Sequence, residues 1–137
     1  MRGREFLEVA KGQFDVGASA ANWRAATIHS YYALLLECRE AMVRWGLPPL
    51  SRLQVHSQVR LRLILSSDAD LQEIGHALEE LGRRRNLANY DLRDLPIFAS
   101  ETQAVQDLQS AEDSLALLDA VDADGGRTAA AIASIKP

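Results

Sequence analysis

The segment with the clearest capacity for chemistry is 83–92, whose sequence is RRRNLANYDL. Apolar residues before it recur every three or four positions, which predicts one buried face of a helix: Leu71, Ile74, Leu78 and Leu81. Continuing that face places Arg85 where an apolar residue is expected, with Tyr90 and Asp91 beside it. An unpaired buried charge is costly. Arg85 therefore either forms an ion pair or lines a cleft.

A second polar segment, 22–34, combines Arg24, His29 and Tyr31 with several apolar residues. On a helix, Arg24 and Tyr31 share a face, whereas Arg24 and His29 are about 140° apart. One interpretation is that Tyr31 packs in the core and bonds through its hydroxyl to a neighbouring charge, Arg85 or Asp91. The other is a polar cluster on two helices that surrounds a cleft.

The charge distribution favours a local basic patch over a generally basic protein. The chain has a net charge of −4 and 15 basic residues, of which only Lys11 and Lys136 are lysines. Arginines gather in two places, and because arginine suits bidentate phosphate contacts we expect binding roles for two of them. The gathered arginines are Arg52, Arg60, Arg62, Arg83, Arg84 and Arg85, with Arg83 and Arg84 as the candidate phosphate contacts.

No sequence motif points to a metal or a cofactor. The three histidines, His29, His56 and His76, lie on different predicted helices and in no closely spaced ligand motif. Glycine-rich phosphate loops and nucleophile motifs are also missing from the sequence. We therefore expect no metal and no cofactor. The single cysteine, Cys38, lies among apolar residues and is expected in the core.

The patterning predicts an all-α protein. Helices are expected at about 4–16, 20–45, 51–65, 69–92 and 100–121, with Ser19 and the segment 66–68 providing helix caps. Short connections between them favour an antiparallel up-and-down four-helix bundle with short additional terminal helices. We expect one bundle domain over 1–122, followed by a loop and a short helix or frayed tail over 123–137.

Two of these segments together resemble HEPN domains (higher eukaryotes and prokaryotes nucleotide-binding). Residues 24–35 resemble the first signature, an arginine followed by a Tyr-Tyr-Ala-hydrophobic run, and 85–92 resemble the second, Arg-x-x-Ala-x-Tyr-Asp in a branch of small stand-alone proteins. His56 resembles a histidine of that branch. The resemblance covers about 5–120. It implies a helical bundle that forms a homodimer, and in active members a metal-independent cleavage of RNA by arginine and histidine.

Transferred to this chain, the second signature assigns catalytic roles to Arg85, Asn86 and Tyr90. Tyr90 stands where active members have histidine, and a tyrosine with a pKa near 10 is a poor base at neutral pH. Arg24, His29, Tyr31, Arg83, Arg84 and Asp91 complete the expected site as binding residues.

Three functions compete at this stage. The first is an RNA- or nucleotide-associated protein. The HEPN resemblance implies that such a protein acts in a prokaryotic defence or toxin–antitoxin system, beside a nucleotidyltransferase-type antitoxin partner. The second is a metal-independent RNase toxin that uses Arg85, Asn86 and Tyr90. The third is a non-catalytic protein-interaction bundle with Arg85 in a structural ion pair. No segment approaches the roughly 20 apolar residues of a membrane span, and no leader is recognisable, so we expect a cytoplasmic protein without membrane association.

Overall fold

The chain is all-helical, as the sequence predicts. The computed structural model describes residues 2–135, and within them it contains no β-strand. Two residues of the predicted C-terminal tail, 136 and 137, lie outside the described residues. The helices are α1 (Gly3–Val16), α2 (Ala20–Arg44), α3 (Val55–Ile64), α4 (Ala69–Tyr90), α5 (Thr102–Asp122) and α6 (Gly125–Ser134), with the short 3₁₀ helix η1 (Pro96–Phe98) between α4 and α5.

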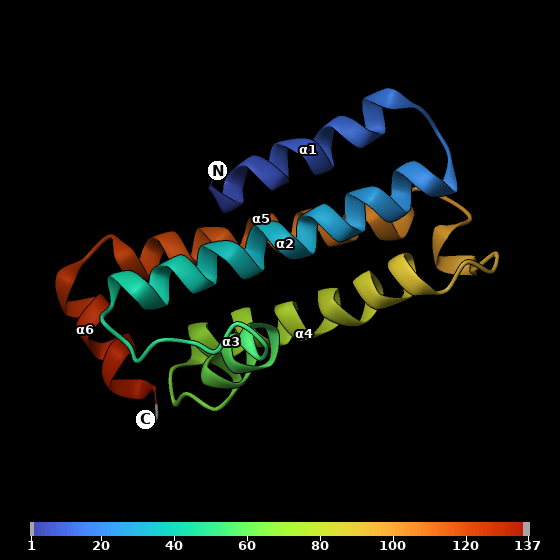
Figure 1. Cartoon of the computed structure of the whole chain (residues 1–137). Helices are drawn as coiled ribbons and strands as arrows, with labels where there is room; N and C mark the ends of the chain where they lie inside the picture. Colours follow the sequence, from blue (N-terminus) through green and yellow to red (C-terminus); the bar gives the residue numbers. More distant parts are fainter. Residues whose placement is uncertain (1, 136–137) are drawn as a thin grey trace.

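Helix α2 is the centre of the arrangement. It packs against α1, α4 and α5, and these four long helices lie alongside one another with successive ones running in opposite directions (Figure 1). Helix α3 packs mainly on α4, and α6 lies across the end of α5. In the described part of the chain, no helix combines the length and the apolar composition that crossing a membrane requires.

The core lies on the faces that the apolar spacing predicts. Leu71, Ile74, Leu78 and Leu81 of α4 are each at most 1% exposed. They pack in one cluster with Tyr31, Leu34, Cys38 and Met42 of α2 and with Leu115 and Leu118 of α5. The predicted core position of Cys38 is confirmed, and burial raises the pKa of its thiol to about 12. This thiol is therefore a packing group and not a nucleophile.

Several predicted helix ends are wrong by a few residues. Helix α3 begins at Val55 and not at residue 51, because the chain leaving Pro48 and Pro49 first forms a turn over 52–54. Helix α4 ends at Tyr90 and not at residue 92. Helix α2 ends at Arg44 and not at 45, and α5 covers Thr102–Asp122 instead of 100–121. The predicted caps are confirmed, since Ser19 accepts from the Asn22 amide and Asp68 accepts from those of Asp70 and Leu71.

A glycine brings α3 close to α4. A Cβ atom on Gly75 would lie 2.8 Å from Ile64 Cγ1 and 2.9 Å from both the Ile64 backbone nitrogen and Leu63 Cβ. Only a residue without a side chain allows this approach. Gly75 therefore fixes the position of α3, and with it His56 and Arg60, against the side of α4 that carries Arg85.

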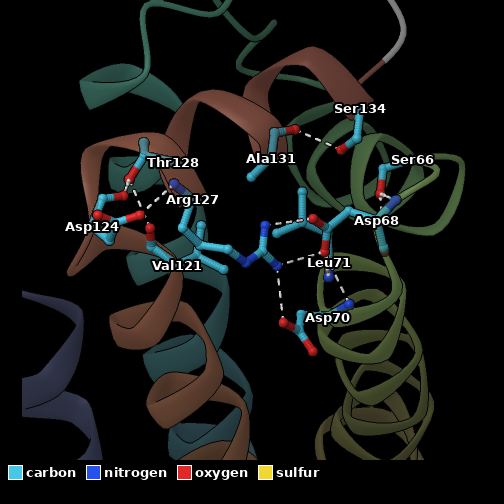
Figure 2. A network of polar contacts seen from close by, with 10 residues as sticks. All are labelled: Ser66, Asp68, Asp70, Leu71, Val121, Asp124, Arg127, Thr128, Ala131 and Ser134. Carbon is cyan, nitrogen blue, oxygen red and sulfur yellow. Dashed lines mark hydrogen bonds and ion pairs between the residues drawn. The ribbon is translucent and has the colours of Figure 1, made fainter.

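The C-terminal helix is attached to the start of α4 by an ion-pair network (Figure 2). Arg127 of α6 donates to both carboxylate oxygens of Asp68, at 2.6 and 2.9 Å, and to Asp70 at 2.9 Å. Asp68 is also the N-cap of α4. The Asp68 carboxylate therefore both caps the start of α4 and binds Arg127 of α6. The tail predicted as helical or frayed is helical, and its Ala131 and Ile135 join the core cluster.

Candidate functional site

A pocket of about 250 Å³ opens between α2, α3 and α4. Its lining combines several cationic and polar side chains with little apolar surface: Tyr31, His56, Arg60, Leu78, Glu79, Gly82, Arg83, Arg85 and Asn86. Of the residues that the sequence predicts for the site, the pocket brings together Tyr31, Arg83, Arg85 and Asn86. It adds His56 and Arg60, to which sequence reasoning assigned no site role.

Arg85 faces this pocket without a carboxylate partner among residues 2–135. Its guanidinium carbon lies 5.0 Å from the centroid of the Tyr31 ring and 5.6 Å from that of Tyr32, in cation–π contact with both. Its Nη2 lies 3.5 Å from His56 Nδ1, and its Nε is buried with no hydrogen-bond partner in the described part of the chain. Of the two interpretations that the sequence leaves open, this geometry corresponds to a cleft and not to an ion pair.

Tyr31 and Arg85 together determine the form of His56. The Tyr31 hydroxyl lies 2.6 Å from His56 Nδ1, and the Arg85 guanidinium also interacts with this hydroxyl and opposes the effect of burial on its pKa, whereas Asp91 does not contact it. Burial raises the pKa of Tyr31, so the phenol keeps its proton and donates it. Arginine can only donate. We therefore assign Nδ1 as the acceptor of both contacts, which leaves the ring proton on Nε2.

His56 is neutral in this environment. Burial, and next the positive charge of Arg85, lower the pKa of its imidazole. Its Nε2 makes no hydrogen bond to any residue of the range 2–135. As an Nε2–H tautomer, the ring is a free donor at neutral pH, and its Nδ1 lone pair is engaged by Tyr31.

Arg60 lies one turn after His56 on α3, on the same face. Its Nε is also buried without a partner among the described residues. The pocket thus combines two guanidinium groups that lack carboxylate partners with an imidazole N–H. Glu79 in the lining already accepts from Arg83 at 3.2 Å. Because the unsatisfied groups are all donors, a small anion is the ligand that this arrangement can satisfy.

Arg24, a predicted binding residue, caps a helix instead. Its Nη1 donates to the carbonyl oxygens of Leu87, Ala88 and Asp91, at 3.2, 3.2 and 2.6 Å, and its Nη2 donates to that of Arg93 at 2.7 Å. The Leu87 and Ala88 carbonyls belong to the last turn of α4, where Leu87 also accepts from the Asp91 amide at 3.0 Å, and the Asp91 and Arg93 carbonyls follow the helix. Arg24 therefore holds the end of α4 and the segment that follows it against α2, and it does not line the pocket.

Arg84 forms the ion pair that the sequence suggested for its neighbour. Its Nε donates to Asp107 of α5 at 2.6 Å, and the side chain of Asp107 is only 1% exposed. Asp107 also accepts from Thr27 at 2.8 Å and from Gln103 at 3.0 Å. This carboxylate is fully engaged, so Arg84 has a structural role on the side of α4 opposite to α3.

The remaining predicted residues lie apart from the pocket. Tyr90 is 76% exposed and lines a shallow depression on the outer face of α4 together with Asp91, Arg83 and Asn86. A hydrogen bond from Arg93 holds the pKa of Asp91 at about 2. His29 packs against Phe6 of α1, with ring centroids 5.8 Å apart, and burial lowers the pKa of its imidazole. Only Arg83 and Asn86 line both the pocket and the depression.

The sequence carries a spacing that would have found the two missing site residues. His56 and Arg60 are four residues apart, so a helix places them on one face. The error in the predicted start of that helix, 51 instead of 55, does not affect the relative positions of His56 and Arg60 on it. The sequence does not show which face of α3 packs toward Arg85, and this information is needed to place His56 and Arg60 in the site.

Among the residues that the structure describes, no three histidine, cysteine, aspartate or glutamate side chains lie close enough together to hold a metal ion. No protein-family model, curated protein or solved structure matches this chain.

Proposed function

We propose that this protein binds RNA through the phosphate backbone and that the pocket between α2, α3 and α4 holds one phosphate group. The observation that carries the proposal is the pair of buried guanidinium nitrogens, Arg60 Nε and Arg85 Nε, that lack partners in the described chain. Leaving such donors unsatisfied is costly. A phosphate in the pocket that accepts from the guanidinium groups of Arg60 and Arg85 offsets this cost.

Binding without cleavage is the better supported form of this function. Cleavage by attack of a ribose 2′-hydroxyl needs a group that accepts its proton. Tyr31 occupies the Nδ1 lone pair of His56 in the assigned tautomer, and the predicted catalytic Tyr90 lies in the depression outside the pocket. Arg85 and Asn86 of the predicted RNase set line the pocket, but the set lacks a base beside them.

We propose a HEPN-like antiparallel four-helix bundle that forms a homodimer in the cytoplasm and acts in a prokaryotic defence or toxin–antitoxin system, beside a nucleotidyltransferase-type antitoxin. The support is the order of the two signatures, at 24–35 and 85–92, on two long helices that pack against each other. Light scattering at high micromolar concentration tests the homodimer, and a monomer there would remove it.

RNA binding is tested by fluorescence anisotropy with a labelled single-stranded RNA of 12 nucleotides. Arg85→Ala and Arg60→Ala are each expected to weaken binding by about tenfold or more, as expected for a lost hydrogen bond to a charged group. Arg52→Ala removes the same charge from an exposed loop residue outside the pocket and is the matched control. Wild-type affinity should also fall steeply with salt.

The result that overturns the proposal is equal binding by all three variants, or no binding by the wild type. Gel analysis of the same RNA in the presence of EDTA separates binding from cleavage. We expect intact RNA. Cleavage that Arg85→Ala abolishes would establish the RNase alternative in its place.

A further inference from the structure

The outer face of α4 continues from the pocket toward the end of the helix. Arg83, Asn86, Leu87 and Tyr90 are all exposed there and form one stripe at helical spacing. Leu92, 86% exposed, extends the surface beyond the helix. Tyr90 and Leu92 are the two most exposed large apolar side chains of this region, and no described residue covers them.

The stripe and the pocket form one continuous surface. Arg83 and Asn86 line both the pocket and the depression that holds Tyr90. Arg85 and Tyr90 are five residues apart on α4, so they differ by about 7.5 Å along the helix axis and by about 140° around it, and Asn86 lies between them on the helix surface.

The two parts differ in charge. The cations of the pocket, Arg60 and Arg85, have no carboxylate partner among residues 2–135, as described above. On the stripe, Arg83 pairs with Glu79 and Glu80, and beyond it Arg93 pairs with Asp91 at 2.6 Å. The stripe therefore offers neutral groups, namely the Asn86 amide and the Tyr90 ring, beside an anion pocket.

We propose that the ligand is single-stranded RNA, with a phosphate in the pocket and an unpaired base stacked on Tyr90. This inference rests on the proposed RNA binding and adds where the strand runs and which kind of RNA it is. A free phosphate uses only the pocket. A duplex keeps its bases stacked inside, whereas a single strand exposes their faces to an aromatic side chain.

The experiment compares three probes by competition against the labelled single-stranded RNA: inorganic phosphate, a single-stranded hexamer and a duplex of the same sequence. Tyr90→Ala is expected to weaken hexamer binding by about tenfold, the effect typical of one stacked base. Tyr90→Phe keeps the ring and is the matched variant, so its affinity should stay within about twofold of the wild type. The dissociation constant for phosphate, calculated from the competition and the affinity of each variant for the labelled RNA, should be unchanged in both variants.

The failures of the two proposals are distinguishable. If Tyr90→Ala binds the hexamer as the wild type does while Arg85→Ala does not, the phosphate pocket stands and the route over Tyr90 is wrong. Duplex binding as tight as hexamer binding also overturns the single-strand inference. If the wild type binds neither RNA nor phosphate, the proposed function fails, and this inference fails with it.

Discussion

Two neighbouring arginines of α4, Arg84 and Arg85, lie on different sides of the helix and have different partners. Toward α5, Arg84 meets a carboxylate, and that carboxylate, Asp107, also accepts from Thr27 and Gln103. Toward α3, Arg85 meets two aromatic rings and a histidine, with no carboxylate among the described residues. Arg84 is satisfied within the fold, whereas Arg85 has a buried Nε without a partner in the described part of the chain.

This contrast distinguishes a charge that has a partner within the fold from one that has none among the described residues. Adjacent residues on a helix point about 100° apart, so a run of arginines must face different neighbours. A buried ion pair satisfies both partners, and breaking it leaves a buried charge without compensation. A cation that lacks an internal partner is instead available to an anion. Position in the sequence does not distinguish Arg84 from Arg85, whereas the side chains that each one contacts do.

The largest expected effect on stability is that of Arg84→Ala. It leaves the buried Asp107 carboxylate without its cation, which should lower the free energy of unfolding by about 3–5 kcal/mol. Urea denaturation followed by circular dichroism measures the change. Arg83→Ala is the control, because its exposed pairs with Glu79 and Glu80 should contribute no more than about 1 kcal/mol. Equal small losses in both variants would contradict a structural role for Arg84.

A smaller effect is expected from Gly75→Ala, on the opposite side of α4. The added methyl group would overlap Ile64 and Leu63, so α3 must shift, at a cost of about 1–3 kcal/mol. RNA affinity should fall as well, because α3 carries His56 and Arg60. Gly12→Ala in α1 is the control, since a Cβ there meets no atom within 4 Å and should stabilise the helix slightly. Unchanged stability in Gly75→Ala would mean that α3 is held loosely.

Arg85→Ala should change stability less than either. The variant loses two cation–π contacts and also removes a partly buried charge without a carboxylate partner, so the two effects oppose each other. We expect a change below about 1 kcal/mol in the free energy of unfolding, together with the loss of RNA binding. A loss of 3 kcal/mol or more would show that Arg85 is structural, like Arg84.

The sequence predicts the helices well and the partners poorly. The spacing of Leu71, Ile74, Leu78 and Leu81 identifies the buried face of α4, because periodicity is a local property. That Arg84 and not Arg85 finds Asp107 depends on how α5 is rotated against α4. The role of Arg24 was missed for a similar reason. The carbonyls that it binds lie at and just after the end of α4, so they can be identified only once that end is located.

The smallest expected effect is a pH dependence that separates stability from binding. The pKa of His56 is lowered in the folded protein by burial and by Arg85, and that of His29 by burial. Below pH 6.5 the unfolded chain therefore binds more protons than the folded one, so stability falls as the pH drops from 6.5 toward the lowered folded values. Urea denaturation at pH 7.5 and 5.5 should show this decrease.

RNA affinity should move in the opposite direction over the same range. Protonation of His56 adds a positive charge beside Arg60 and Arg85 in the pocket, while the RNA phosphates stay anionic and favour the protonated form. Anisotropy titrations at the two pH values should therefore show tighter binding at pH 5.5. The variant His56→Gln keeps a polar side chain that does not titrate, so it should lose this increase and retain only the part of the stability change that His29 contributes. An equal increase in His56→Gln would place the titrating group outside the pocket.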